Sequence, residues 1–164
     1  PAPPNVQLVR GRQGREMSEA ERAHLGPGTV IIKSAAVADY HLENVPEQKV
    51  KKTAMRMSLE LSPTPDILAE VGQKKGDRLL IGFAAETENL VAEARRKMET
   101  KNCDMVVGNL VSQQGIGFES DENEVVLVNR AGETVKLGKA AKRVIADQIL
   151  DQLTKLRLAR RASV

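Results

Sequence analysis

Apolar runs of strand length alternate with helical periods through the first two thirds of the chain, and this order constrains the fold most strongly. Residues 29–36, 78–83 and 104–107 are short apolar runs, and the segments between them carry apolar residues at helical spacing. Helices that connect strands in this way favour a parallel sheet with helices packed on it. Because such crossovers are right-handed, ligand-binding residues gather at the carboxyl ends of the strands. The sequence therefore predicts a doubly wound, Rossmann-like α/β fold.

Three helices are predicted in this part of the chain, over residues 15–25, 64–72 and 88–101. Ser18 and Glu21 have the spacing of a capping box in the first of them. Apolar residues at helical spacing are expected to be buried in the other two helices, namely Ile67, Leu68 and Val71, and Leu90, Val91, Ala94 and Met98.

The last third of the chain has a different pattern. Residues 125–128 and 134–137 are strand-like and flank a turn over 129–133, which predicts a β-hairpin. A final helix is predicted from Lys139 to about Leu156, and the residues expected to be buried on it are Val144, Ile145, Ile149 and Leu153. Since no repeat or linker divides the 164 residues, we expect a single domain.

Composition excludes several classes of function. Aromatic residues make up 2% of the chain, so the stacking platforms of single-strand nucleic-acid binders are absent and no nucleic-acid partner is expected. The single cysteine, Cys103, excludes an internal disulfide framework and favours a reducing compartment. No apolar run reaches membrane-spanning length, and residues 1–4 lack the features of a signal peptide. We therefore expect a cytoplasmic protein without a membrane partner.

A carboxylate and a group of lysines follow the first predicted strand. Residues 35–40 form a small-residue turn that carries Asp39, and residues 49–52 place Lys49 in a polar loop ten residues later. A carboxylate at a strand end can contact a hydroxyl group or a metal ion, and a loop lysine can neutralise charge on phosphates. The pair is typical of a triphosphate site. The alternative is that Asp39 is an ordinary turn residue and that the lysines form a solvated run.

Three further motifs follow in order. Residues 64–68 read Thr-Pro-Asp-Ile-Leu, residues 81–87 read Ile-Gly-Phe-Ala-Ala-Glu-Thr, and Lys97 and Lys101 precede Asn-Cys-Asp at 102–104. The whole series resembles the phosphopantothenoylcysteine synthetase half of bacterial coenzyme A biosynthesis proteins, over about residues 29–153. Each motif alone is weak, but five motifs in the same order are specific.

The resemblance implies a ligase that joins 4′-phosphopantothenate to cysteine through an acyl-cytidylate and consumes CTP. Lys49 would be the catalytic lysine that covers the triphosphate and the activated acyl group. Asp39 would contact the nucleotide near the ribose or an Mg²⁺ ion. The other residues that would bind the nucleotide are Lys33, Ser34, Ala35, Pro65, Asp66, Ile67, Leu68, Phe83, Lys97 and Lys101. Among these, Phe83 would pack on the base or sugar and the last two lysines would reach phosphates.

Simpler interpretations stay open for several of these residues. Lys97 and Lys101 are four residues apart and share a helix face, which is also typical of a solvated surface. Phe83 could serve only core packing. Cys103 is interpreted as a small buried residue and not as a nucleophile. The absence of a Walker A motif and of Gly-x-Gly-x-x-Gly weakens the P-loop interpretation and the nicotinamide interpretation.

The resemblance also implies a homodimer, and an FMN-dependent decarboxylase domain fused to or associated with the chain in most bacteria. FMN would belong to that domain only. In one respect the sequence departs from the family: nothing before Arg15 matches the strand and Gly-rich segment with which members begin. The alternatives are therefore a CTP-binding fragment without turnover and, less favoured, a dinucleotide-dependent oxidoreductase. The basic end at 160–164 is interpreted as a frayed terminus, a kinase site or an appended tag.

Overall fold

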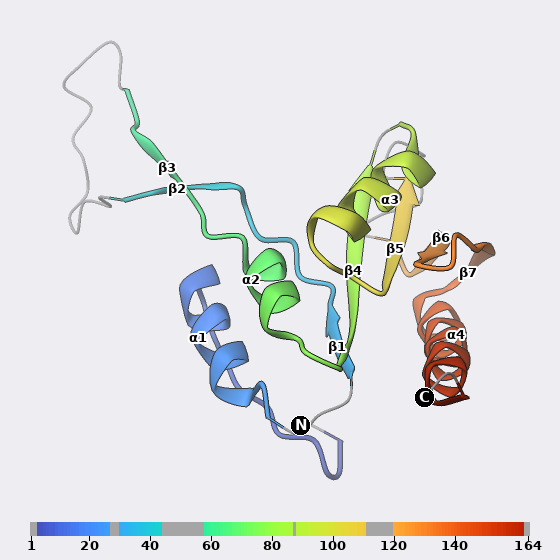
Figure 1. The fold of residues 1–164 in the computed structure, drawn as a ribbon. Helices are drawn as coiled ribbons and strands as arrows, with labels where there is room; N and C mark the ends of the chain where they lie inside the picture. Colours follow the sequence, from blue (N-terminus) through green and yellow to red (C-terminus); the bar gives the residue numbers. More distant parts are fainter. Residues whose placement is uncertain (1–2, 27–29, 44–57, 87, 111–119, 163–164) are drawn as a thin grey trace. The chain divides into compact units, whose positions relative to one another are not determined.

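The computed structural model describes residues 3–26, 30–43, 58–86, 88–110 and 120–162. The chain falls into two compact units, whose elements are labelled in Figure 1. The first unit holds residues 1–26 and 36–67, and the second holds residues 27–35 and 68–164. The single domain expected from the sequence stays a prediction.

The second unit is built on a five-stranded sheet with the strand order β1-β4-β5-β6-β7. The strands are β1 (Val30–Lys33), β4 (Leu79–Glu86), β5 (Met105–Leu110), β6 (Glu122–Asn129) and β7 (Thr134–Ala141). β1, β4 and β5 pair in parallel, whereas β6 is antiparallel to both of its neighbours. Four of the five strands therefore run in the same direction. This confirms the predicted α/β fold class, a mostly parallel sheet followed by a β-hairpin and a C-terminal helix.

One face of the sheet packs against α4 (Lys142–Ala162). Every second residue of the central strands belongs to this core, as strand geometry requires, and Ile81 and Val107 are 0% exposed. The helix contributes three residues at helical spacing, Ile145, Ile149 and Leu153. Burying one such aliphatic side chain contributes about 1.5–3 kcal/mol, so an aliphatic core compensates for the scarcity of aromatic residues.

The intervening residues of the central strands face α2 (Ile67–Lys74) and α3 (Leu90–Thr100). Glycines allow the close approach of these helices. A Cβ at Gly82 would lie 3.1 Å from Leu68 Cδ2, and a Cβ at Gly108 would lie 2.7 Å from Leu90 Cδ1. The expected buried residues of both helices are buried, except Val91, which is half-buried.

The first unit contains α1 (Gly14–His24) and a two-stranded antiparallel ladder of β2 (Tyr40–Leu42) and β3 (Leu61–Pro63). The backbone N–H of Thr64 donates to the carbonyl oxygen of Asp39 at 2.8 Å, which extends the contact between the two segments. Tyr40 and Leu61 are 60% and 57% exposed. A two-stranded ribbon of this kind has little core of its own.

Three predicted features of the helices were wrong. Ser18 is not a helix cap, because α1 begins at Gly14 and Ser18 is buried within the helix. α4 begins at Lys142 and not at Lys139, because residues 139–141 continue β7, in which Ala140 and Ala141 pair with β6. Val144, which was expected to be buried on this helix, is 45% exposed.

Two smaller differences concern α2 and β1. α2 begins at Ile67 and continues through Gly72 to Lys74, so Thr64 and Pro65 precede the helix. β1 ends at Lys33 and not at Ala36, the end of the predicted apolar run. It is an edge strand among the described strands, and its Ile32 is 45% exposed.

Candidate functional site

The carboxyl ends of the parallel strands form one edge of the sheet in the second unit. Ser34 and Ala35 follow β1 directly and are exposed, and Glu86 ends β4. Asn109, near the end of β5, is in register with Ala85 of β4. The predicted gathering of these strand ends at one edge is therefore confirmed for the residues of this unit.

Lys33 and Phe83 lie within β1 and β4, a few residues before this edge. Lys33 is the last residue of β1, pairs in register with Gly82 and is only 8% exposed. Phe83 is half-buried and packs against the core on the α4 side of the sheet. The core-packing interpretation of Phe83 is thus observed, and its contact with a base or sugar stays a prediction.

Several predicted site residues belong to the first unit. Asp39 is exposed, and so are Pro65 and Asp66 just before α2. Ile67 is 4% exposed, so it can offer a ligand little more than its backbone N–H group. Lys49 lies outside the described residues. The nucleotide contacts expected of all these residues stay predictions.

Leu68 is the first residue of the second unit and is only 8% exposed. Its side chain lies against Gly82 in the core, so only its backbone could take part in nucleotide binding.

Lys97 and Lys101 lie at the end of α3. Lys97 is in the last turn of the helix and Lys101 is its C-cap, whose backbone N–H donates to the carbonyl oxygen of Lys97 at 3.0 Å. This end of α3 leads to the amino end of β5, so their backbones are a helix length away from the carboxyl edge. Side chains on a helix lean toward its N-terminus, which for α3 is the direction of that edge. Both side chains are half-buried.

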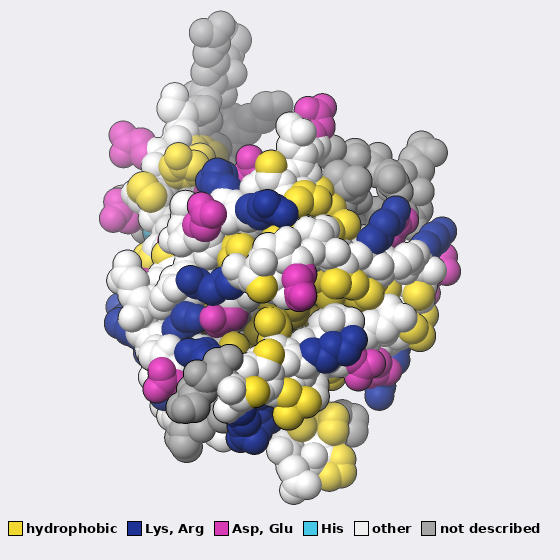
Figure 2. Space-filling view, turned by 45° about the vertical axis from the view of Figure 1, so that its right-hand side comes forward, with side chains coloured by type: hydrophobic (Ala, Val, Ile, Leu, Met, Phe, Trp, Pro, Cys, Tyr) yellow, Lys and Arg dark blue, Asp and Glu magenta, His cyan; other side chains and the backbone are white. Residues whose placement is uncertain are grey.

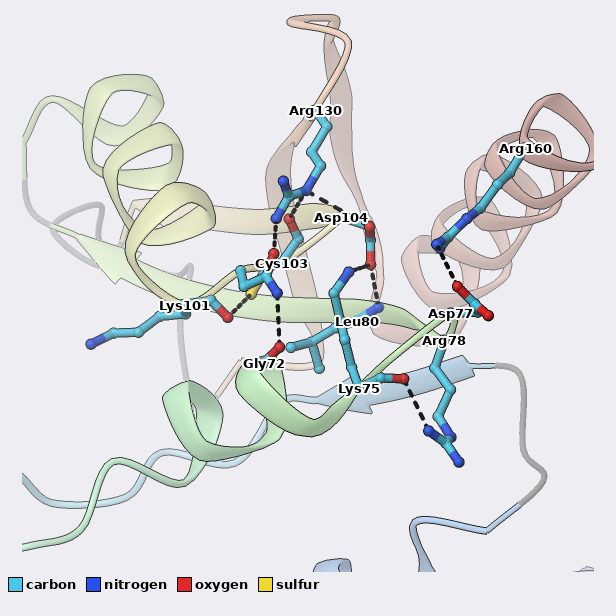
Figure 3. A network of polar contacts seen from close by, with 11 residues as sticks. Gly72, Lys75, Asp77, Arg78, Leu80, Lys101, Cys103, Asp104, Arg130 and Arg160 are labelled. Carbon is cyan, nitrogen blue, oxygen red and sulfur yellow. Dashed lines mark hydrogen bonds and ion pairs between the residues drawn. The ribbon is translucent and has the colours of Figure 1, made fainter. Parts of the chain in front are cut away.

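A polar network surrounds Asp104 at the amino end of β5, and Figure 3 shows its members. The Asp104 carboxylate accepts hydrogen bonds from Lys75 Nζ and from the backbone N–H of Leu80, the latter at 2.7 Å. The side chains of Lys75 and Asp104 are 7% and 13% exposed. Arg130, in the turn between β6 and β7, lies 3.8 Å from the other carboxylate oxygen. The network therefore ties the end of α2, two strands and the hairpin turn together.

Asn102 is the second centre of this network. Its side-chain Nδ2 donates to the carbonyl oxygen of Gly72 at 2.8 Å, and Arg130 Nη2 donates to its Oδ1. Arg130 Nε also donates to the carbonyl oxygen of Cys103 at 2.8 Å. Sequence reasoning missed these roles and used the Asn-x-Asp motif only as a family marker. The signal was present, because Asn directly after a helix is typical of a left-handed C-terminal residue.

Cys103 lies between Asn102 and Asp104 in the sequence and is 0% exposed. Burial, with a smaller contribution from the charge of Asp104, raises the pKa of its thiol from 9.0 to about 11. A thiol with such a pKa carries almost no thiolate at neutral pH. The prediction that Cys103 is a small buried residue is confirmed.

Charges of both signs share the surface. On the face in Figure 2, blue Lys and Arg side chains are interspersed with magenta acidic ones and with apolar atoms. Within the described part of the chain, no three His, Cys, Asp or Glu side chains gather into a possible metal site. None of the described helices is both long and apolar enough to cross a membrane.

Residues 1–156 match the family model described as the DNA/pantothenate metabolism flavoprotein C-terminal domain. The chain is 38% identical over 151 residues to the coenzyme A biosynthesis bifunctional protein CoaBC of Bacillus subtilis (strain 168). That alignment covers 92% of this chain and 37% of the relative, so the chain spans little more than a third of that protein.

Solved structures show the same fold. The crystal structure of the C-terminal domain of a coenzyme A biosynthesis bifunctional protein CoaBC is 33% identical, with a TM-score of 0.77. The match covers 96% of this chain and 69% of that one. A Cab2 H337A mutant in complex with phosphopantothenate-cysteine matches with a TM-score of 0.53 at 19% identity, over 77% of this chain and 45% of that one. At this identity the match shows the fold alone.

Proposed function

Because the chain belongs to the family of DNA/pantothenate metabolism flavoprotein C-terminal domains, we propose that it is a phosphopantothenate–cysteine ligase domain of coenzyme A biosynthesis. The observation that carries the proposal is the 38% identity with a coenzyme A biosynthesis protein across 92% of this chain. The protein of similar fold that was solved with phosphopantothenate-cysteine holds the compound that such a ligase would make.

The proposed reaction has two steps. A carboxylate oxygen of 4′-phosphopantothenate attacks the α-phosphorus of CTP, and the bond to the pyrophosphate leaving group breaks. The amine of cysteine then attacks the acyl carbon of the acyl-cytidylate, CMP leaves, and the amine loses a proton as the amide forms. Neither step requires a nucleophilic side chain, since positioning and charge neutralisation are sufficient. A buried, protonated Cys103 agrees with this chemistry.

The residues of the second unit suit the binding of a nucleotide. Ser34 and Ala35 are exposed at the carboxyl edge, where ligands of doubly wound sheets bind. Phe83 is only half-buried, and its ring would pack on the base or sugar. Lys97 and Lys101 lie toward the other end of the sheet, so they would supply positive charge to phosphates that extend away from the carboxyl edge. We also propose Lys49 as the lysine that closes over the triphosphate and lowers the barrier to the first step.

Magnesium would accompany CTP. Mg²⁺ is commonly held by one or two carboxylates together with substrate phosphates, and the exposed Asp39 fits that pattern. An ion bound there would neutralise phosphate charge.

We further propose a cytoplasmic homodimer. A decarboxylase domain that uses FMN would be fused to or associated with the chain, since the similar Bacillus subtilis protein is bifunctional and much longer.

Nucleotide preference tests this proposal most simply. Calorimetric titration should show that CTP binds to the protein and that ATP binds much more weakly. NAD should not bind, because the chain has no Gly-x-Gly-x-x-Gly motif. Binding of NAD as tight as that of CTP would overturn the ligase proposal and favour a dinucleotide-dependent oxidoreductase.

A further inference from the structure

Asn102 occupies a position at which glycine would be the simplest choice. Its backbone N–H donates to Glu99 O at 3.3 Å and the N–H of Cys103 donates to Met98 O at 2.9 Å, which is the Schellman pattern at the end of α3. In this pattern Asn102 adopts a φ of 53°, in the left-handed region that glycine enters without cost. The backbone conformation therefore admits asparagine but favours glycine.

The side chain of Asn102 explains the choice. It bridges two elements, because Nδ2 donates to Gly72 O of α2 and Oδ1 accepts from Arg130 in the hairpin turn. Arg130 also holds the next carbonyl group, that of Cys103. We call these two side-chain hydrogen bonds of Asn102 the Asn102 bridge. Glycine would preserve the turn and lose the bridge.

The backbone of Lys101 lies next to the Asn102 bridge and makes close contacts of its own. The carbonyl oxygen of Lys101 lies so close to Gly72 that a Cβ on this glycine would approach it to 2.0 Å. The backbone N–H of Lys101 donates to the carbonyl oxygen of Lys97. The Lys101 side chain extends away from the polar network in Figure 3. A rigid backbone thus carries a long cationic side chain outward.

We propose that Asn102 is a positioning residue for Lys101: the Asn102 bridge fixes the lysine backbone so that its ammonium group meets the phosphates of the nucleotide. This inference rests on the proposed function, in which Lys101 contacts CTP. A fixed backbone leaves only side-chain freedom to be lost when the phosphate binds, so less entropy opposes the contact. Without the bridge, the same lysine would bind CTP more weakly although the fold is retained.

Asn102→Gly tests the proposal, because it keeps the left-handed turn and removes only the bridge. The Kd of CTP, measured by calorimetry on the full chain, should rise about three- to tenfold, in the lower range of couplings between contacting residues. The melting temperature should stay within a few degrees of the wild-type value. An unchanged Kd for CTP in the folded Asn102→Gly protein would overturn the proposal and leave Asn102 a structural residue.

Asn89→Gly is a matched control for melting temperature. Asn89 is the N-cap of the same helix, has a φ of 52° and makes no side-chain capping hydrogen bond. This variant therefore reports relief of backbone strain without loss of a bridge.

If Asn102→Gly fails to fold, Arg130→Lys provides the test, because one ammonium group cannot reproduce the two guanidinium contacts. The same rise in Kd is then expected, and an unchanged Kd would overturn the proposal.

A double-mutant cycle shows whether Asn102 acts through Lys101. In a Lys101→Ala background, Asn102→Gly should no longer change the Kd of CTP. An effect that persists in that background would overturn the positioning role. The same measurements distinguish this proposal from the proposed function. If the wild-type protein does not bind CTP, both are overturned. If the wild-type protein binds CTP and Asn102→Gly leaves the Kd unchanged, only the positioning role of Asn102 is overturned.

Discussion

The carbonyl oxygen of Lys101 lies so close to Gly72 that a Cβ on this glycine would approach it to 2.0 Å. Gly72→Ala should therefore destabilise the protein, although alanine is the better helix former by about 1 kcal/mol. The clash is with backbone atoms of Lys101, so it cannot be relieved by a side-chain rotation. We expect the free energy of unfolding to fall by about 1–3 kcal/mol, measured by urea denaturation.

Gly138→Ala is the matched control for this prediction. Gly138 lies in β7, and a Cβ built there meets no atom within 4 Å. Its substitution should change the free energy of unfolding by less than about 0.5 kcal/mol. A Gly72→Ala protein as stable as Gly138→Ala would contradict the close packing between α2 and the end of α3.

Asp104→Ala should be among the most damaging single substitutions in the second unit. It leaves the buried ammonium group of Lys75 without its carboxylate and removes the acceptor of the Leu80 N–H group. Breaking a buried ion pair from one side costs about 3–5 kcal/mol, and we expect a loss of this size in chemical denaturation. Arg143→Ala removes the exposed pair with Asp147 and should cost under about 1 kcal/mol. Equal losses in the two variants would contradict the buried network.

Ionisation of the Cys103 thiol should lower the free energy of unfolding at alkaline pH. Its pKa is raised to about 11 in the folded protein by burial, so the unfolded chain ionises first as the pH rises. The stability due to the protonated thiol is therefore complete below about pH 9 and is lost between about pH 9 and 11. The loss should be on the order of 2–3 kcal/mol, from about 1.4 kcal/mol per pKa unit.

Denaturation of the wild-type protein and of Cys103→Ala over this pH range isolates the thiol contribution, because the lysines are common to both proteins. The wild-type protein should lose stability more steeply than the variant as the pH rises from 9. Parallel curves would show that Cys103 ionises as readily in the folded protein as in the unfolded chain.

Lys49→Ala should lower turnover and leave stability nearly unchanged. Lys49 belongs to a polar stretch without apolar periodicity, so its loss should shift the free energy of unfolding by less than about 0.5 kcal/mol. A cation that meets developing charge acts mainly in the transition state, so kcat should fall more than CTP binding weakens. Steady-state kinetics and thermal melting check both parts. A variant with the wild-type rate would remove Lys49 from the proposed mechanism.

The fold was largely predictable because its strands and helices have clear apolar periods. Ile145, Ile149 and Leu153 were assigned to the core from spacing alone, and all three are buried. The start of α4 was not predictable in the same way, since Ala140 and Ala141 are held in β7 by pairing with β6 and not by their own pattern. Tertiary pairing overrides local propensity at such boundaries.

The candidate site was less predictable than the fold. The strand ends could be placed because parallel strands share a carboxyl edge, as Ala85 and Asn109 show. The contacts of Asn102 and Arg130 join residues 28 positions apart, and no local pattern specifies such a pair. Asn102 and Arg130 come into contact only when the hairpin turn is folded against the end of α3.

Pyrophosphate release tests the central proposal most directly. It should be measured on the natural full-length protein with CTP, 4′-phosphopantothenate and cysteine, omitting each in turn. The ligase account predicts that release requires both CTP and 4′-phosphopantothenate, that omission of cysteine does not abolish the first turnover, and that ATP is a poor substitute. No release with all three compounds present, or release at the same rate without 4′-phosphopantothenate, would contradict the account.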